Sequence, residues 1–111
     1  MQTVELDAAT WTSALDFYDA LLAALIAPKW HGKNVNALVD SMIYGRINVI
    51  EPPLRVNFTG LEKAGYKARD AFEQAAEVLA SEGAHCHLNA DGSASIEIVW
   101  PLSTGSFKKE R

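Results

Sequence analysis

A few groups of residues in this chain carry side chains that could do acid–base, metal or nucleophilic chemistry. His31 and Asp40 flank the stretch GKNVNALV, and the sequence HCH places His85 and His87 on either side of Cys86. An imidazole and a carboxylate can exchange protons with a substrate near neutral pH. A small enzyme that used His31 as acid and Asp40 as base would need a concave pocket that holds both side chains.

The HCH stretch reads as part of a strand, which sets where its side chains point. Successive side chains of a strand alternate, so His85 and His87 face one side and Cys86 the other. Two imidazoles could begin a metal site, but a zinc site needs two more ligands and the sequence indicates none. The alternative is a polar strand face. Cys86 is interpreted as a small buried side chain, because no base can be identified beside it.

Acidic residues also line one face of a predicted long helix. Asp70, Glu73 and Glu77 recur at the three- and four-residue spacing that places side chains on one helical face. This row is either a solvated face or a charged patch that meets a basic partner. The glycines match neither the dinucleotide-binding nor the P-loop pattern, so the sequence predicts no phosphate loop.

The turn around PKWHGKN offers a better-defined surface. Trp30 precedes His31 and a glycine, Asn34 and Asn36 follow, and Asp40 lies in the helical pattern beyond them. Aromatic rings contribute a large contact area at low entropic cost, which favours a protein-binding site with both rings held out by the loop. Structural roles compete with this interpretation. Trp30 could plug the core, Asn34 could only cap the helix, and Asp40 could be an idle surface acid.

Overall composition narrows the class of protein. The 111 residues predict one domain, and the net charge of −4 argues mildly against nucleic acid as a direct partner. A single cysteine excludes an internal disulfide and fits a reducing cytoplasm. The start, MQTVELDAAT, lacks the features of a signal peptide. The longest apolar run is too short to cross a bilayer, so no membrane association is expected.

Periodicity and turn residues predict the order β-α-α-β-α-α-β-β. The first helix should bury Leu15, Tyr18, Leu22, Leu25 and Ile26 and stop at Pro28. A second helix over about 35–44 should end at Gly45. A long helical stretch, divided near residue 65, should bury Ala68, Phe72, Ala75, Ala76 and Leu79. The turn ADGS predicts a closing hairpin, and residues 103–111 read as a loose basic tail after a domain of residues 1–102.

The turn and second helix together resemble the barstar family of intracellular ribonuclease inhibitors. The shared pattern, here P-K-W-H-G-K-N-V-N-A-L-V-D, spans residues 28–40, and the order of elements extends the likeness to about residue 88. The resemblance implies an α/β fold with a small three-stranded, mainly parallel sheet covered by about four helices. The closing hairpin is then an addition to that sheet.

The resemblance also implies roles for single residues. Trp30 and His31 occupy the family's aromatic positions, Gly32 allows close approach of the backbone, and Asn34 holds the loop and caps the helix.

Further along the match, Asp40 takes the position of the family's dominant acid, which occupies a phosphate subsite on the nuclease. Asn36 stands where the family has an acid, Val39 stands where it has a tryptophan, and Glu82 matches an acid near the end of the last helix.

The sequence therefore predicts an inhibitor or immunity protein for a secreted or toxin ribonuclease. It would bind 1:1 through the 28–46 loop and helix, act without a cofactor, a metal or catalytic residues, and be monomeric when free. An alternative is an interaction module of the same fold whose partner is not a nuclease.

Overall fold

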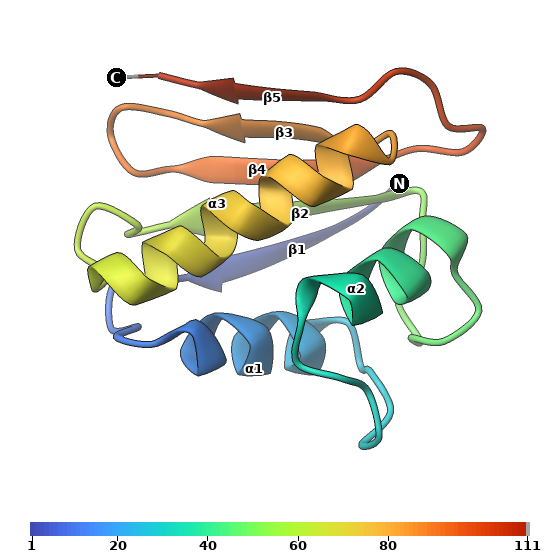
Figure 1. Ribbon diagram of the computed structural model, residues 1–111, viewed down its shortest axis with the longest axis horizontal. Coiled ribbons are helices and arrows are strands. Elements are labelled where there is room, and N and C mark those ends of the chain that lie inside the picture. The colour runs from blue at the N-terminus through green and yellow to red at the C-terminus, as the bar shows by residue number, and fades with distance from the viewer. Residues whose placement is uncertain (111) are drawn as a thin grey trace.

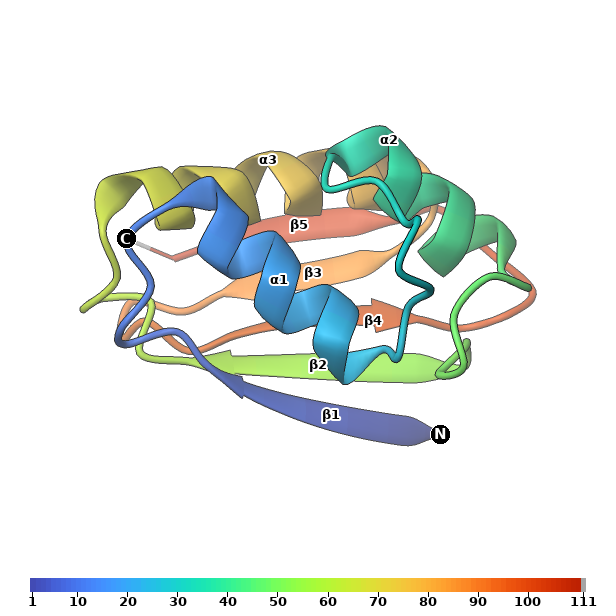
Figure 2. The same ribbon diagram turned by 90° about the horizontal axis from the view of Figure 1, so that it is seen from below.

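Three helical segments pack on one face of a five-stranded mixed sheet (Figure 1; Figure 2). The computed structural model describes residues 1–110. None of the helices within those residues is long and apolar enough to cross a bilayer. The elements in chain order are β1 (Gln2–Asp7), α1 (Ala14–Ala24), α2 (Val35–Leu38), η1 (Val39–Tyr44), β2 (Leu54–Thr59), α3 (Tyr66–Ser81), β3 (His85–Leu88), β4 (Ala94–Ile98) and β5 (Ser106–Lys109).

The strands are ordered β1-β2-β4-β3-β5 across the sheet. β1 pairs parallel with β2 and β3 pairs parallel with β5, while β4 runs antiparallel to both of its neighbours. All strands except β4 therefore point the same way. One row that crosses the whole sheet faces the helices and consists of apolar side chains: Val4, Val56, Ile96, Cys86 and Phe107.

The prediction of a three-stranded, mainly parallel sheet is wrong in the number and the pairing of strands. The closing hairpin is confirmed, but β4 inserts between β2 and β3 rather than extending one edge. The physical reason is burial: Ile96 and Ile98 are fully buried, and a central position covers them better than an edge does.

The prediction of a loose tail is wrong for residues 106–109, which form β5 beside β3. Phe107 turns its ring toward the helices and lies 6.4 Å, centroid to centroid, from the ring of Phe72 in α3. Phe107 thus packs the segment against the core, although most of the other residues of the segment are polar. The last residue of the predicted tail, Arg111, lies outside the described residues.

The expected helix count of about four is also too high, because residues 1–110 contain three helical segments: α1, the continuous α2–η1, and α3. Residues 61–64 form turns instead of a short helix. The predicted buried face of α3 is confirmed at all five positions.

The buried face of α1 differs from the predicted stripe. Leu15 and Ile26 are exposed, and Phe17 and Leu21 are fully buried in their place. Ile26 lies beyond the end of α1 with a φ of 53°, so helical spacing no longer describes where its side chain points. The ring of Phe17 instead joins an aromatic cluster with Phe58 of β2.

The start of α1 forms a capping box. The Ser13 hydroxyl accepts a hydrogen bond from the Asp16 backbone N–H at 3.2 Å, and the Asp16 carboxylate accepts one from the Ser13 N–H at 3.2 Å. The Thr12 backbone N–H also donates to Asp16, at 2.8 Å. These hydrogen bonds, that of Thr12 foremost, lower the pKa of the Asp16 carboxyl below its ordinary value of 3.8.

We expect the substitution Asp16→Ala to destabilise the protein at neutral pH but not in strong acid. A carboxyl whose pKa is lower in the folded state adds stability above its unfolded pKa, and this is lost as the pH falls through the folded value. The midpoint of urea unfolding should therefore be lower for the variant than for the wild type at pH 7, and this difference should be smaller at pH 3. An equal difference at both values would contradict the charged capping role.

Candidate partner-binding site

A ten-residue connection between α1 and α2, residues 25–34, carries the exposed tryptophan and is closed by local hydrogen bonds. The Pro28 carbonyl accepts a hydrogen bond from the His31 backbone N–H at 3.0 Å, which forms a turn around Trp30. Asn34 then caps α2, because its side-chain oxygen accepts from the Ala37 N–H at 2.9 Å. Its predicted role as a cap is confirmed. The helix continues through η1 until Gly45, whose φ of 78° ends it.

His31 is a buried anchor beneath this connection. Its ring is only 6% exposed, so the expectation that the loop holds both rings out is wrong for His31. Nδ1 lies 2.7 Å from the Gly32 carbonyl oxygen and Nε2 lies 2.8 Å from Oγ of Ser41 in η1. A carbonyl can only accept, so Nδ1 carries the proton, and in the neutral ring Nε2 accepts from the Ser41 hydroxyl. The ring thereby ties the loop to the helix.

Gly32 is needed for the loop to lie close to the first turn of α2. A Cβ at this position would lie 3.1 Å from the Cβ of Ala37 and 3.0 Å from Nδ2 of Asn34. Any larger residue would push the loop away from the cap that Asn34 makes. In the free protein, the backbone that Gly32 allows to come close is therefore that of the loop, and it comes close to the first turn of α2.

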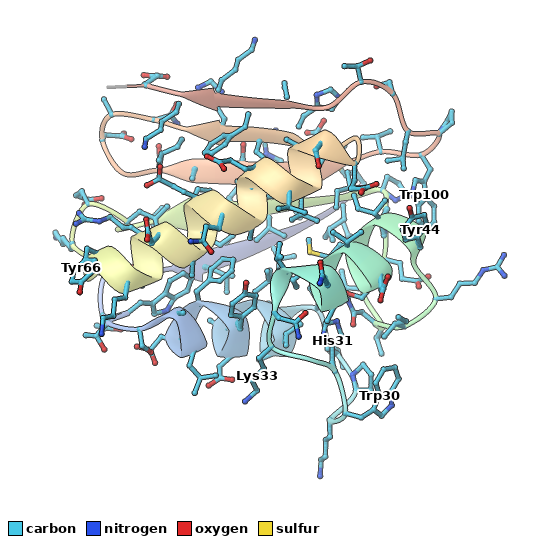
Figure 3. All side chains as sticks on the ribbon, viewed as in Figure 1. Trp30, His31, Lys33, Tyr44, Tyr66 and Trp100 are labelled. Atoms are coloured by element: carbon cyan, nitrogen blue, oxygen red, sulfur yellow. The ribbon has the colours of Figure 1, made fainter. Side chains whose placement is uncertain are left out.

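Trp30 projects from the tip of this anchored loop (Figure 3). Its side chain is 74% exposed, which rules out the alternative that it plugs the core. Lys33, the nearby cation, turns toward α1 and forms an ion pair with Asp19, with the charged atoms 2.8 Å apart. The positive charge beside the loop is therefore partly balanced within the chain.

The outward face of α2 and η1 presents polar groups at intervals of four residues. Asn36, Asp40 and Tyr44 are exposed there, while Leu38, Ser41 and Met42 are buried beneath them. Val39 is half-buried and packs on the edge of the core. Tyr44 was not among the residues that the sequence singled out, although its spacing from Asp40 on one helical face was a signal for it.

Glu82 is the C-cap residue of α3 and is exposed. α3 packs against α2 and η1, and Figure 1 shows its C-terminal end at the same side of the molecule as η1. Glu82 therefore lies at the side of the fold where η1 is, and its role in binding stays a prediction.

His31 and Asp40 do not form an acid–base pair. Both ring nitrogens of His31 already have partners within the protein, and the ring is covered by the loop. Asp40 stands in solvent on the outer face of the helix. The two side chains thus belong to opposite sides of the same segment, which removes the basis for the enzymatic interpretation.

The HCH stretch behaves as a structural strand. Cys86 faces the core, and burial raises the pKa of its thiol to about 12. His85 and His87 lie on the sheet face that carries no helix, within reach of Ser106 at 3.3 Å and Glu110 at 3.0 Å respectively. Within residues 1–110, no cluster of three or more His, Cys, Asp or Glu side chains could hold a metal ion.

These features define a class of protein: a helix-covered α/β domain that presents an exposed tryptophan and a carboxylate on a rigid loop and helix, as protein-binding domains do. The family model described as Barstar (barnase inhibitor) matches residues 1–97, and the chain belongs to this family. Barstar-family proteins are non-enzymatic inhibitors, and membership implies a ribonuclease-inhibitor role. The comparisons with curated proteins and with solved structures gave no match.

The neighbouring rings of Trp30 and His31 should differ sharply in their effect on stability. We expect His31→Ala to lower the free energy of unfolding by about 2 kcal/mol or more, because it removes a buried ring together with its hydrogen bonds to the Gly32 carbonyl and the Ser41 hydroxyl. Trp30→Ala should change it by less than about 0.5 kcal/mol, because the ring is exposed. Urea denaturation measures both. Equal losses would show that the loop is not anchored by His31.

Cys86 should be nearly inert to alkylation in the folded protein. With the pKa raised from 9.0 to about 12, the thiolate fraction at pH 8 falls about a thousandfold relative to an unperturbed thiol. Iodoacetamide labelling followed by mass spectrometry should therefore modify the native chain slowly and the urea-unfolded chain quickly. Rapid labelling of the native protein would place Cys86 outside the core.

Proposed function

We propose that this chain is an intracellular inhibitor, or immunity protein, of a ribonuclease-type toxin, and that it blocks the toxin's active site by 1:1 binding through residues 28–46. One observation carries the proposal. Trp30 and Asp40 are both exposed on a segment that is fixed from below by His31 and at its start by Asn34. A binding surface that is already ordered when free loses little conformational entropy on binding.

The mechanism is occlusion without turnover. A ribonuclease active site holds cationic side chains that bind phosphate, and the Asp40 carboxylate is an anion of the right kind to take the place of a phosphate there. Asn36, one helical turn earlier, supplies an amide that can both donate and accept hydrogen bonds. Trp30 adds apolar contact area at the rim of the active site. Val39 and Glu82 border this surface, Val39 through its half-exposed side chain.

Charge should assist the encounter. The net charge of −4 attracts a basic nuclease, and Asp19 balances Lys33 at the edge of the binding segment. Complementary charge raises the association rate more than it lowers the dissociation rate. The protein would act in the cytoplasm as a monomer, where it protects the cell's own RNA, and would need no contact with RNA itself.

A second candidate function is an interaction module for a partner that is not a nuclease. The observation that favours it is the chemistry at Asn36 and Val39, where a neutral amide and a small aliphatic side chain stand in place of an acid and a large aromatic ring. In that case Trp30 would still bind the partner, while Asp40 would be dispensable.

The test is retention and inhibition of ribonuclease activity. The tagged wild type should retain a small basic ribonuclease from lysate and secreted fractions of its source and inhibit it in a 1:1 ratio. Asp40→Ala and Trp30→Ala should each weaken inhibition by about 30-fold or more, as expected for central residues of an interface.

Matched control variants are available on α3. Tyr66→Ala removes an exposed aromatic ring at the opposite end of the molecule from Tyr44 (Figure 3). Asp70→Ala removes an exposed carboxylate about one turn further along α3. Both controls should inhibit as the wild type does. A partner without nuclease activity that is bound equally by wild type and Asp40→Ala would overturn the inhibitor proposal in favour of the interaction module.

A further inference from the structure

The connection between β4 and β5 exposes large apolar side chains beside the candidate site. Val99, Trp100 and Leu102 are 38%, 40% and 38% exposed, and the neighbouring Tyr44 is 65% exposed. The connection, residues 99–105, lies beyond residue 97, where the family match ends, so family membership assigns it no role. Clustered apolar side chains on the surface of a small protein commonly mark an interaction site.

Trp100 is fixed against the end of η1. Its indole Nε1–H donates a hydrogen bond to the Ile43 carbonyl at 3.1 Å. The ring lies over Gly45, since a Cβ there would be only 2.6 Å from the Cη2 atom of Trp100. This packing puts Trp100 beside the residue that follows Tyr44, and Figure 3 shows both side chains on the side of the molecule where η1 ends.

Leu102 carries the connection toward α3. A Cβ at Gly83 would lie 3.2 Å from two carbon atoms of the Leu102 side chain, so Leu102 packs directly beside the residue that follows Glu82. Tyr44, Trp100 and Leu102 therefore place partly exposed apolar side chains at the end of η1, over Gly45 and beside the end of α3. We call these three residues the apolar patch.

Carboxylates border the apolar patch. Asp40 lies one turn before Tyr44 and Glu82 lies beside Gly83. A carboxylate oxygen of Glu51 would be 3.5 Å from a Cβ at Gly45, and this oxygen accepts a hydrogen bond from the Arg46 backbone N–H. The Arg46 side chain adds one positive charge just after the end of η1. An apolar centre with a mainly acidic rim fits an apolar side chain surrounded by basic residues on a partner.

Size gives an independent reason for a second contact region. A stable protein interface takes roughly 20–30 residues from each partner. Residues 28–46 number fewer than twenty, and the buried ones among them cannot contact a partner: His31, Leu38, Ser41, Met42, Ile43 and Gly45. Tight binding therefore needs surface beyond this segment, and the apolar patch adjoins its far end.

We propose that the apolar patch is a second contact region of the partner-binding surface. It binds an apolar side chain on the same basic ribonuclease, while residues 28–46 cover the active site of that enzyme. This inference rests on the proposed function. The carboxylates attract the ribonuclease, and the apolar patch slows its release. A second copy of this chain is a poorer occupant, because a symmetric dimer would bring Asp40 and Glu82 of both copies together.

The first test uses photo-crosslinking with p-benzoylphenylalanine in the source's own lysate and secreted fractions. The probe replaces Trp30 in one variant, Leu102 in a second, and the exposed Leu15 of α1 in a control. We expect the probes at 30 and 102 to capture the same protein, identified as a ribonuclease by mass spectrometry and RNA cleavage, and the probe at 15 not to capture it.

The outcomes separate the two proposals. A ribonuclease captured at 30 but not at 102 would overturn the apolar patch and leave the inhibitor function standing. No ribonuclease at either position would overturn both. A crosslink from 102 to a second copy of this chain would make the patch a dimer contact and overturn its assignment to the ribonuclease.

The second test measures dissociation of the captured, purified ribonuclease from immobilised variants. Leu102→Ala and Tyr44→Ala should each raise the dissociation rate about tenfold, whereas Leu15→Ala should leave it unchanged. Unchanged dissociation rates for Leu102→Ala and Tyr44→Ala would contradict the proposal.

Discussion

The candidate binding surface depends on the hydrogen bonds of the buried His31 ring. This ring joins the Gly32 carbonyl in the loop to the Ser41 hydroxyl in η1 and so ties the loop to the helix. Trp30 and Asp40 lie on either side of this link. Without it, the loop would keep the Pro28 turn, the Lys33–Asp19 ion pair and the Asn34 cap but would lose its link to η1, and ordering the loop would oppose binding.

The one-sided arrangement of the sheet decides where the rest of the surface lies. Because all helices pack on one face, the ends of α3 and η1 meet at one side of the molecule (Figure 1). The insertion of β4 between β2 and β3 brings the chain back to that same side before β5 begins. Trp100 can therefore dock on Gly45, and a segment near the C-terminus joins a surface built mainly from residues 28–46.

Much of the local structure could be predicted from the sequence. The Ser13–Asp16 capping box, the Asn34 cap, the buried face of α3 and the hairpin turn each depend on residues close together in the chain. The motif from Pro28 to Asp40 was likewise sufficient to indicate the family. Such features follow from short-range hydrogen bonding and from the period of a helix, both of which appear in the spacing of residues along the sequence.

Only the tertiary structure decided which segments meet. Periodicity shows that a strand has an apolar face but does not name its neighbours, so the central place of β4 and the pairing of β5 through Phe107 were not visible. The burial of His31 depends on Ser41, a whole helix segment away from the loop. Two adjacent aromatic residues look alike in the sequence, but packing against the rest of the chain buries His31 and leaves Trp30 in solvent.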